Sequence, residues 1–255
     1  MNNILKVKNI EKYYGNKGNI TKALDDISFE VNEGEFIGVM GSSGSGKTTL
    51  LNCISTIDDV TAGHIFIDNS DLTELSSKNL SEFRKEKLGF VFQDYNLLDT
   101  LTGFENIAIT LTILKESPEV IEEKIQKVSK KLGIEDVLNK YPYEMSGGEQ
   151  QRVAAARAII KDPTIILADE PTGSLDSKSS KVLMNTFSKL HKDFNATIIL
   201  VTHDAYTASY TDRILFLKDG KIFNEIIKGE DSQKEYFTNI IEVTSFLGGD
   251  MDNVI

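Results

Sequence analysis

Cysteine and long apolar runs are scarce in this 255-residue chain, and tryptophan is absent. The single cysteine, Cys53, excludes an internal disulfide and fits a reducing compartment, and we expect it to be buried. No apolar run approaches the roughly 20 residues that span a bilayer. The first residues carry no apolar stretch long enough for a signal peptide. If the protein works at a membrane, we therefore expect another polypeptide to bring it there.

Positive charge is also in short supply. Lys and Arg total 28 against 39 Asp and Glu, which gives a net charge of −11. Nucleic-acid backbones and anionic lipid surfaces both reward Lys and Arg. The charge therefore argues against nucleic acid or lipid as the main partner, and it leaves contact with a membrane protein open.

The stretch from Gly41 to Thr48 matches the phosphate-loop pattern G-x-x-x-x-G-K-[ST]. Residues 36–40 predict a buried strand before it and residues 49–54 a helix after it, which is the context that the motif requires. Glycines let backbone N–H groups point at a polyphosphate. Lys47 is expected to reach the β- and γ-phosphates, and the Thr48 hydroxyl to ligate Mg²⁺. The sequence therefore predicts binding of a nucleoside triphosphate with Mg²⁺.

The predicted phosphate contacts come from the loop and the helix that follows it: Gly41, Ser42, Ser43, Gly44, Ser45, Gly46, Lys47, Thr48 and Thr49.

Strands and helices alternate over much of the chain. Residues 164–168 and 196–201 are nearly continuous apolar runs, typical of parallel strands covered on both faces, with a helical stripe over 177–192 between them. This order predicts an α/β fold with a parallel sheet. Residues 4–37 predict antiparallel strands that lead into the strand before the phosphate loop, and residues 214–227 resemble a closing hairpin.

Helix signals dominate from residue 94 to about 160. Ser117 and Pro118 form a helix start, and Gly133 closes the same apolar stripe. We predict a nucleotide-binding domain over residues 1–230, with a core at 1–93 and 161–228 and a helical subdomain at 94–160. An acidic tail at 231–255 is expected to be partly helical.

Two carboxylates, Asp169 and Glu170, follow the apolar run at 164–168. In a doubly wound sheet the active crevice lies at the carboxyl ends of the strands, beside the phosphate loop. Asp169 is placed to hold Mg²⁺, directly or through water, and Glu170 to act as general base towards the attacking water. The alternative is an acidic cap for the next helix, which the accompanying phosphate loop makes the weaker interpretation.

Two further candidates leave alternatives open. Ser146, Gly147, Gly148 and Glu149 form a capping box that can simply begin a helix, or a helix start that binds a second phosphate group. Since one chain already has its phosphate loop, the second interpretation predicts a dimer in which each Ser146 loop covers the nucleotide of the other copy. Tyr14 is either an aromatic on a strand or a platform for an adenine ring, and the sequence favours neither.

Six elements together resemble the ATP-binding subunits of ABC transporters in order and spacing, over about residues 1–225: Gly41–Thr48, Gln93, Ser146–Gln150, Ile165–Glu170, Ser174–Asp176 and His203. The resemblance implies a P-loop NTPase with a RecA-like core, an N-terminal antiparallel β subdomain and an inserted α-helical subdomain. It also implies an ATP-dependent head-to-tail homodimer.

The same resemblance implies roles for three residues that spacing alone does not explain. Gln93 would touch Mg²⁺ and sense a transmembrane partner. Asp176 would lie in the loop that crosses the dimer interface, and His203 would contact the γ-phosphate and Glu170. Met145 and Glu149 stand where the family usually has Leu and Gln, while the serine and both glycines that carry the phosphate contact are present.

Two short stretches, 54–58 and 89–102, are similar to the bacitracin-export type, and the tail at 246–250 also looks like that subgroup. This implies an ATPase that powers a separate membrane permease from the cytoplasmic side of the cell membrane, for export of or resistance to antimicrobial peptides. Tyr95–Leu101 is the expected docking region. The alternatives are a lipoprotein-release, macrolide-efflux or cell-division complex, and a soluble ABC ATPase.

Overall fold

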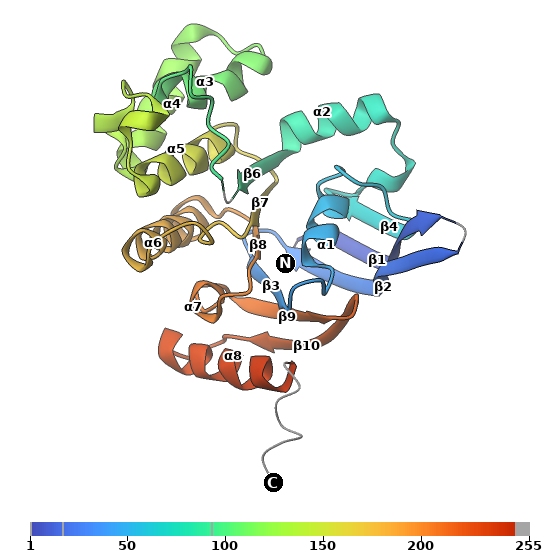
Figure 1. Ribbon diagram of the computed structural model, residues 1–255. Coiled ribbons are helices and arrows are strands. Elements are labelled where there is room, and N and C mark those ends of the chain that lie inside the picture. The colour runs from blue at the N-terminus through green and yellow to red at the C-terminus, as the bar shows by residue number, and fades with distance from the viewer. Residues whose placement is uncertain (1, 17, 93, 248–255) are drawn as a thin grey trace.

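The computed structural model describes residues 2–16, 18–92 and 94–247 (Figure 1). Its chain forms two β-sheets, a group of helices at one end and a helix close to the C-terminus. Our expectations for Gln93 and for the tail beyond residue 247 lie outside the described residues.

A six-stranded sheet carries the predicted nucleotide site, in the order β10-β9-β3-β8-β7-β6. Its strands from β9 to β6 pair in parallel, and β10 is antiparallel to β9, so the expected parallel sheet and closing hairpin are both present. The bounds are β3 Phe36–Gly41, β6 Leu88–Phe92, β7 Ile165–Asp169, β8 Ile198–Val201, β9 Arg213–Lys218 and β10 Lys221–Ile227.

The central strands are buried on both faces. Ile199 and Val201 of β8 pack in one apolar cluster with α1 (Lys47–Ile54), while Ile198 and Leu200 pack in another with α5 (Gly147–Ile159) and α6 (Ser177–Phe194). This arrangement explains the continuous apolar runs, because side chains that alternate between two covered faces must all be apolar. Cys53 of α1 lies in the first cluster, 2% exposed, and its burial raises the pKa of the thiol to about 12.

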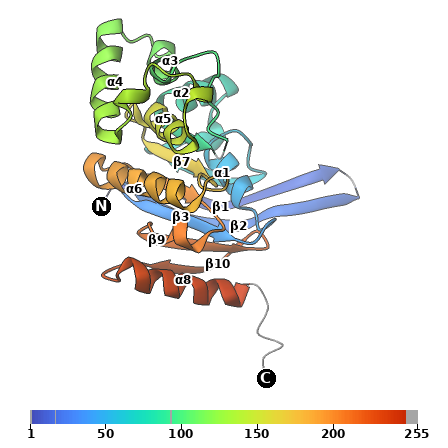
Figure 2. The ribbon, with the colours of Figure 1, turned by 60° about the vertical axis from the view of Figure 1, so that its left-hand side comes forward.

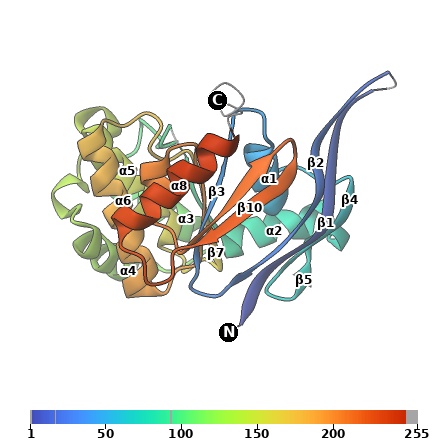
Figure 3. The same cartoon turned by 90° about the horizontal axis from the view of Figure 1, so that it is seen from below.

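The predicted N-terminal antiparallel strands form a separate four-stranded sheet, β2-β1-β4-β5. Its strands are β1 Asn3–Asn16, β2 Asn19–Asn32, β4 Ala62–Ile67 and β5 Ser70–Asp71. The first two strands are longer than their apolar stretches predict, since backbone pairing continues through Tyr14↔Thr21 and beyond. The resulting β1–β2 hairpin extends away from the rest of the molecule (Figures 2 and 3).

The expected helical insertion lies at one end of the molecule (Figure 1). It contains α3 Gly103–Ile113, α4 Pro118–Leu132, α5, and two 3₁₀ turns at Glu135–Val137 and Pro142–Glu144. The predicted caps of α4 are present: the Ser117 side chain accepts a hydrogen bond from the Val120 N–H, and Gly133 closes the helix with φ = +62°.

The remaining helices are α2 Ser77–Lys87, α7 Ala205–Ala208, α8 Gln233–Leu247 and a 3₁₀ turn at Leu72–Glu74. The helix expected in the acidic tail, α8, is packed into the fold: Tyr236 and Ile240 are fully buried in a cluster with Met40 and Phe216. Figure 3 shows α8 lying along the β10 side of the larger sheet.

Candidate nucleotide site

The phosphate loop lies between β3 and α1, and its shape depends on glycine. Gly46 precedes the helix with φ = +104°, and a Cβ added there would lie 2.5 Å from the Ala23 carbonyl oxygen. Gly41 is equally restricted, because its added Cβ would lie 2.3 Å from the Leu217 carbonyl oxygen. Any side chain at these positions would therefore push the loop away from the sheet edge.

Lys47 places a buried positive charge inside this loop. Its Nζ donates to the carbonyl oxygens of Gly41 and Ser42, each at 3.0 Å, and the residue is 8% exposed. Burial lowers the pKa of Lys47, while the nearby carboxylates of Glu170 and Asp169 act in the opposite direction. The ammonium is thus in position to neutralise a polyphosphate held by the loop.

Asp169, at the end of β7, is half-buried, and one of its carboxylate oxygens is buried without a hydrogen-bond partner in the part of the chain that the structure describes. Its Oδ1 has no hydrogen-bond partner among the described residues, and neither has the buried Oγ of Ser45 in the loop. Burial raises the pKa of Asp169, and Glu170 adds to the effect, whereas Lys47 and a hydrogen bond with Thr48 lower it. Unsatisfied buried polar atoms are rare in folded proteins, so one in the phosphate loop and one at the end of β7 point to a missing ligand.

The donor set fits Mg²⁺. Asp169 and Thr48 offer carboxylate and hydroxyl oxygens, which this cation prefers, and it is normally held by one or two protein groups plus phosphates and water. The described part of the chain contains no group of three or more His, Cys, Asp and Glu residues arranged to hold a metal ion.

Glu170 and His203 meet at the same edge of the sheet. The His203 ring Nδ1 lies 2.9 Å from Glu170 Oε1 and 3.0 Å from Oε2. The His203 side chain is 70% exposed and that of Glu170 20%, so the pair faces solvent from a partly covered position. Glu170 also has φ = +44°, a conformation that a non-glycine residue rarely adopts.

The residues expected to act across a dimer are helix caps within this chain. The Ser146 backbone N–H donates to Glu149 Oε2 at 2.7 Å, and the Glu149 N–H lies 3.4 Å from Ser146 Oγ, which completes the capping box of α5. Asp176 caps α6 by accepting from the N–H groups of Lys178 and Ser179 at 2.8 and 3.0 Å. Ser146 and Asp176 are both exposed, so their helix starts are open to another molecule.

Tyr14 lies near the end of β1, and its hydroxyl donates to Asp58 Oδ2 at 2.5 Å. The pKa of Tyr14 is raised, first by burial and then by the hydrogen bond to Asp58, while a hydrogen bond with Thr49 of α1 lowers it. The residue is 42% exposed, and the Lys12 ammonium lies over its ring, 5.0 Å from the centroid.

The structure also reveals polar residues that the sequence analysis missed. Arg157 of α5 donates to the carbonyl oxygens of Asn96 and Tyr95 at 2.5 and 2.8 Å. Gln151 of the same helix donates to two other backbone carbonyls near the site. Arg157 had a signal in the sequence, because it interrupts the alanine-rich second half of α5, whereas Gln151 stands among other polar residues and had none.

A second missed contact joins the loops that follow Glu170 and His203. The buried hydroxyls of Thr172 and Thr207 lie 3.0 Å apart, and Thr207 Oγ1 donates to Asp204 Oδ2 at 2.6 Å. Single threonines carry no pattern that predicts such a pairing.

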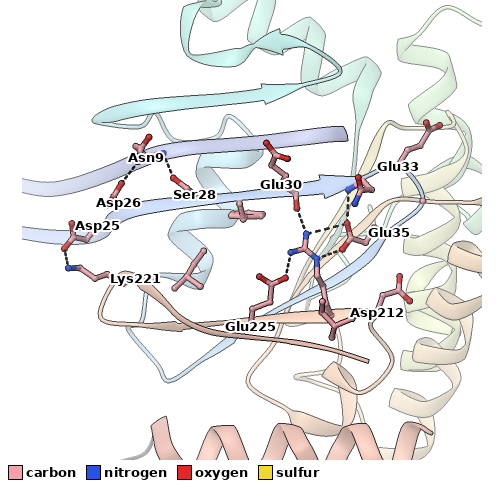
Figure 4. Close-up of a pocket in the computed structure, with 16 residues that line it drawn as sticks. Asn9, Asp25, Asp26, Ser28, Glu30, Glu33, Glu35, Asp212, Lys221 and Glu225 are labelled. Atoms are coloured by element: carbon pink, nitrogen blue, oxygen red, sulfur yellow. Dashed lines mark hydrogen bonds and ion pairs between the residues drawn. The ribbon is translucent and has the colours of Figure 1, made fainter. Parts of the chain in front are cut away.

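A large hollow lies elsewhere. It has a volume of about 1190 Å³ between β2 and the β9–β10 hairpin, and acidic residues outnumber basic ones in its lining (Figure 4). Arg213 bridges Glu35 and Glu225 across it. Its lining includes no phosphate-loop residue, and its negative charge would repel a nucleotide, so the candidate site remains the edge at Lys47.

Comparison with known proteins agrees with this geometry. A sequence model of the family described as ABC transporter matches residues 24–173. The chain belongs to this family, whose ATP-binding members hydrolyse ATP. In the described part of the chain, no helix has the length and apolar character needed to cross a membrane.

Two curated relatives match nearly end to end. The ABC transporter ATP-binding protein YxdL of Bacillus subtilis strain 168 is 52% identical over 255 residues, covering 100% of this chain and 98% of the relative. The bacitracin export ATP-binding protein BceA of Halalkalibacterium halodurans is 49% identical over 246 residues, covering 96% and 97%. The predicted resemblance to the bacitracin-export type is thus confirmed.

A solved structure supports the fold. The ATP-binding cassette MJ0796 of Methanocaldococcus jannaschii, a dimer in a post-hydrolysis state bound to ADP and Pi, is 40% identical, with a TM-score of 0.78. The match covers 88% of this chain and 98% of that one.

Replacing Asp169 by Asn tests whether the site stores electrostatic strain. The raised pKa of Asp169 means that its ionised carboxylate is disfavoured in the folded state. The free energy of unfolding therefore falls as pH rises through the ordinary Asp range, and it is still lowered at pH 7. We expect Asp169→Asn to raise the free energy of unfolding of the nucleotide-free protein by about 1 kcal/mol. It should also remove the extra stabilisation that Mg²⁺ adds to ATP, measured by thermal unfolding.

Asp162→Asn is the matched control, because that side chain is 82% exposed. It should change the free energy of unfolding by less than about 0.5 kcal/mol. A destabilised Asp169→Asn protein that still responds to Mg²⁺ would contradict the assignment.

Proposed function

We propose that this chain is the Mg²⁺-dependent ATPase subunit that powers a separate membrane permease from the cytoplasmic side of the membrane. The observation that carries the proposal is the convergence of three groups at one sheet edge. The buried ammonium of Lys47, the unpartnered Oδ1 of Asp169 and the Glu170–His203 pair all lie at the carboxyl ends of neighbouring parallel strands.

In this proposal the loop from Gly41 to Thr49 binds the phosphates, and Tyr14 offers its ring face to adenine. Mg²⁺ would be held by Thr48, Asp169 and Gln93, and supplies charge neutralisation when bound. Glu170 accepts a proton from the water that attacks the γ-phosphorus in line with the leaving oxygen. His203 holds the Glu170 carboxylate in place and contacts the γ-phosphate. Catalysis is then mainly positioning and charge stabilisation.

The second half of each site comes from another copy. The helix start at Ser146, Gly147, Gly148 and Glu149, where Ser146 is exposed, carries a partial positive charge, and it would contact the γ-phosphate held by the other copy. Asp176 would lie at the interface. ATP then links the two copies, and loss of the γ-phosphate releases them, which gives a switch that can drive a permease.

The relatives favour antimicrobial-peptide export or resistance as the process served, because one carries bacitracin export in its name. The proposed permease contact is the segment 95–101. Leu98 there is 46% exposed, although its backbone is anchored by Asn106, whose side chain accepts from the Leu98 N–H at 2.8 Å. An exposed apolar side chain on a fixed backbone suits a protein contact.

Glu170→Gln tests the catalytic assignment. An amide cannot accept the proton of water, so we expect turnover to fall by about 100-fold or more. The Kd for ATP should change by less than about threefold, since the phosphate loop is intact. Steady-state phosphate release and equilibrium nucleotide binding measure the two effects. Wild-type turnover in this variant would remove Glu170 from the role of base.

A pull-down tests the partner. Tagged Glu170→Gln protein, incubated with ATP and captured from detergent-solubilised membranes, should carry with it a permease with a large extracytoplasmic domain, identified by mass spectrometry. The same protein with Leu98→Glu should lose that permease while still binding ATP. Recovery of ribosomal proteins, or of no membrane protein at all, would contradict the transporter assignment.

A further inference from the structure

Gln151 is a buried polar residue with an unusual pair of partners. It lies on α5, is fully buried, and its Nε2 donates to the carbonyl oxygens of Phe92 at 3.3 Å and Pro171 at 3.0 Å. Both partners are acceptors, so only the amide nitrogen can face them, and the orientation of the side chain is fixed by chemistry. Its Oε1 is buried and has no hydrogen-bond partner in the described ranges.

The two carbonyls flank the reacting edge of the sheet. Phe92 ends β6 and is opposite Asp169 in the parallel register of β6 and β7. Pro171 directly follows Glu170. A single amide from the helical segment therefore holds the backbone beside the proposed metal ligand and the backbone next to the proposed base.

Glu170 needs such support because its backbone has φ = +44°. A residue in this region keeps its conformation only where its surroundings determine it from several sides. Two backbone contacts hold it: the Glu170 N–H donates to the carbonyl oxygen of Val201 on β8, and the Glu170 carbonyl accepts from the Gly173 N–H in the following turn, both at 2.9 Å. The bond from Gln151 to Pro171 is the contact that α5 adds.

We propose that Gln151 is a positioning residue for ATP hydrolysis, which fixes the direction of the Glu170 carboxylate from the helical segment. The inference rests on the proposed role of Glu170. It would also give α5 two functions, since the exposed start of this helix at Ser146 would contact the other copy, and Gln151 in the next turn bonds to the residue after the proposed base. Contact at the start of α5 and placement of Glu170 are then parts of one rigid element.

Gln151→Glu tests the inference with almost no change in shape. A carboxylate cannot donate to the two carbonyl oxygens and is repelled by them. We expect kcat to fall by about 10- to 100-fold, since small displacements of a reacting group have effects of this size. The KM and the Kd for ATP should stay within about threefold, because the phosphate loop is not touched.

Two further variants exclude simpler explanations. Gln151→Met removes the donor without adding charge and keeps the volume, so it should show the same loss of kcat and gives a result if Gln151→Glu fails to fold. Gln233→Glu is the matched control: this glutamine at the start of α8 donates to Ser209 Oγ at 3.1 Å, far along the chain from the site. Its kcat should stay within twofold of wild type.

A combined variant separates positioning from a general structural role. If Gln151 acts through Glu170, adding Gln151→Glu to Glu170→Gln should cause less than a twofold further loss of the residual turnover. An undiminished loss in that background, an unchanged kcat in the single variants, or a rise in KM equal to the loss in kcat would overturn the inference. If Glu170→Gln alone keeps wild-type turnover, the proposed function fails instead.

Discussion

The parallel pairing of β3, β8 and β7 is the constraint on which the rest of the site depends. Because these strands run in one direction, their carboxyl ends share one edge, and the loops that leave that edge carry Lys47, Glu170 and His203. Burial of the strands on both faces fixes the edge in place. Residues far apart in sequence can then meet within hydrogen-bonding distance, as His203 and Glu170 do.

This edge holds three residues in unfavourable surroundings. They are the buried Lys47, the half-buried Asp169 with an unpartnered oxygen, and Glu170 with its positive φ. Folded proteins tolerate such groups where a ligand will satisfy them. A triphosphate with its cation would supply both the negative charge that Lys47 needs and the positive charge that Asp169 needs, so binding and relief of strain are the same event.

The sequence predicted the elements whose signals are local. The phosphate loop, the buried strands and both caps of α4 follow from residues within a few positions of one another, and the structure agrees. What it could not predict depends on contacts between distant segments. The length of the β1–β2 hairpin comes from cross-strand pairing, and α8 packs on the fold because Tyr236 and Ile240 are buried against Met40 and Phe216 of the sheet. Gln151 gave no signal, since its partners are backbone carbonyls supplied by two other segments.

We expect each nucleotide site to be completed by a second copy of the chain. Light scattering of the Glu170→Gln protein, which should hold ATP without hydrolysing it, tests this most directly. With ATP and Mg²⁺ we expect the mass of a dimer, twice 28.4 kDa, and with ADP the mass of the monomer, 28.4 kDa. A protein that stays at the monomer mass with saturating ATP, or that dimerises equally with ADP, would contradict it.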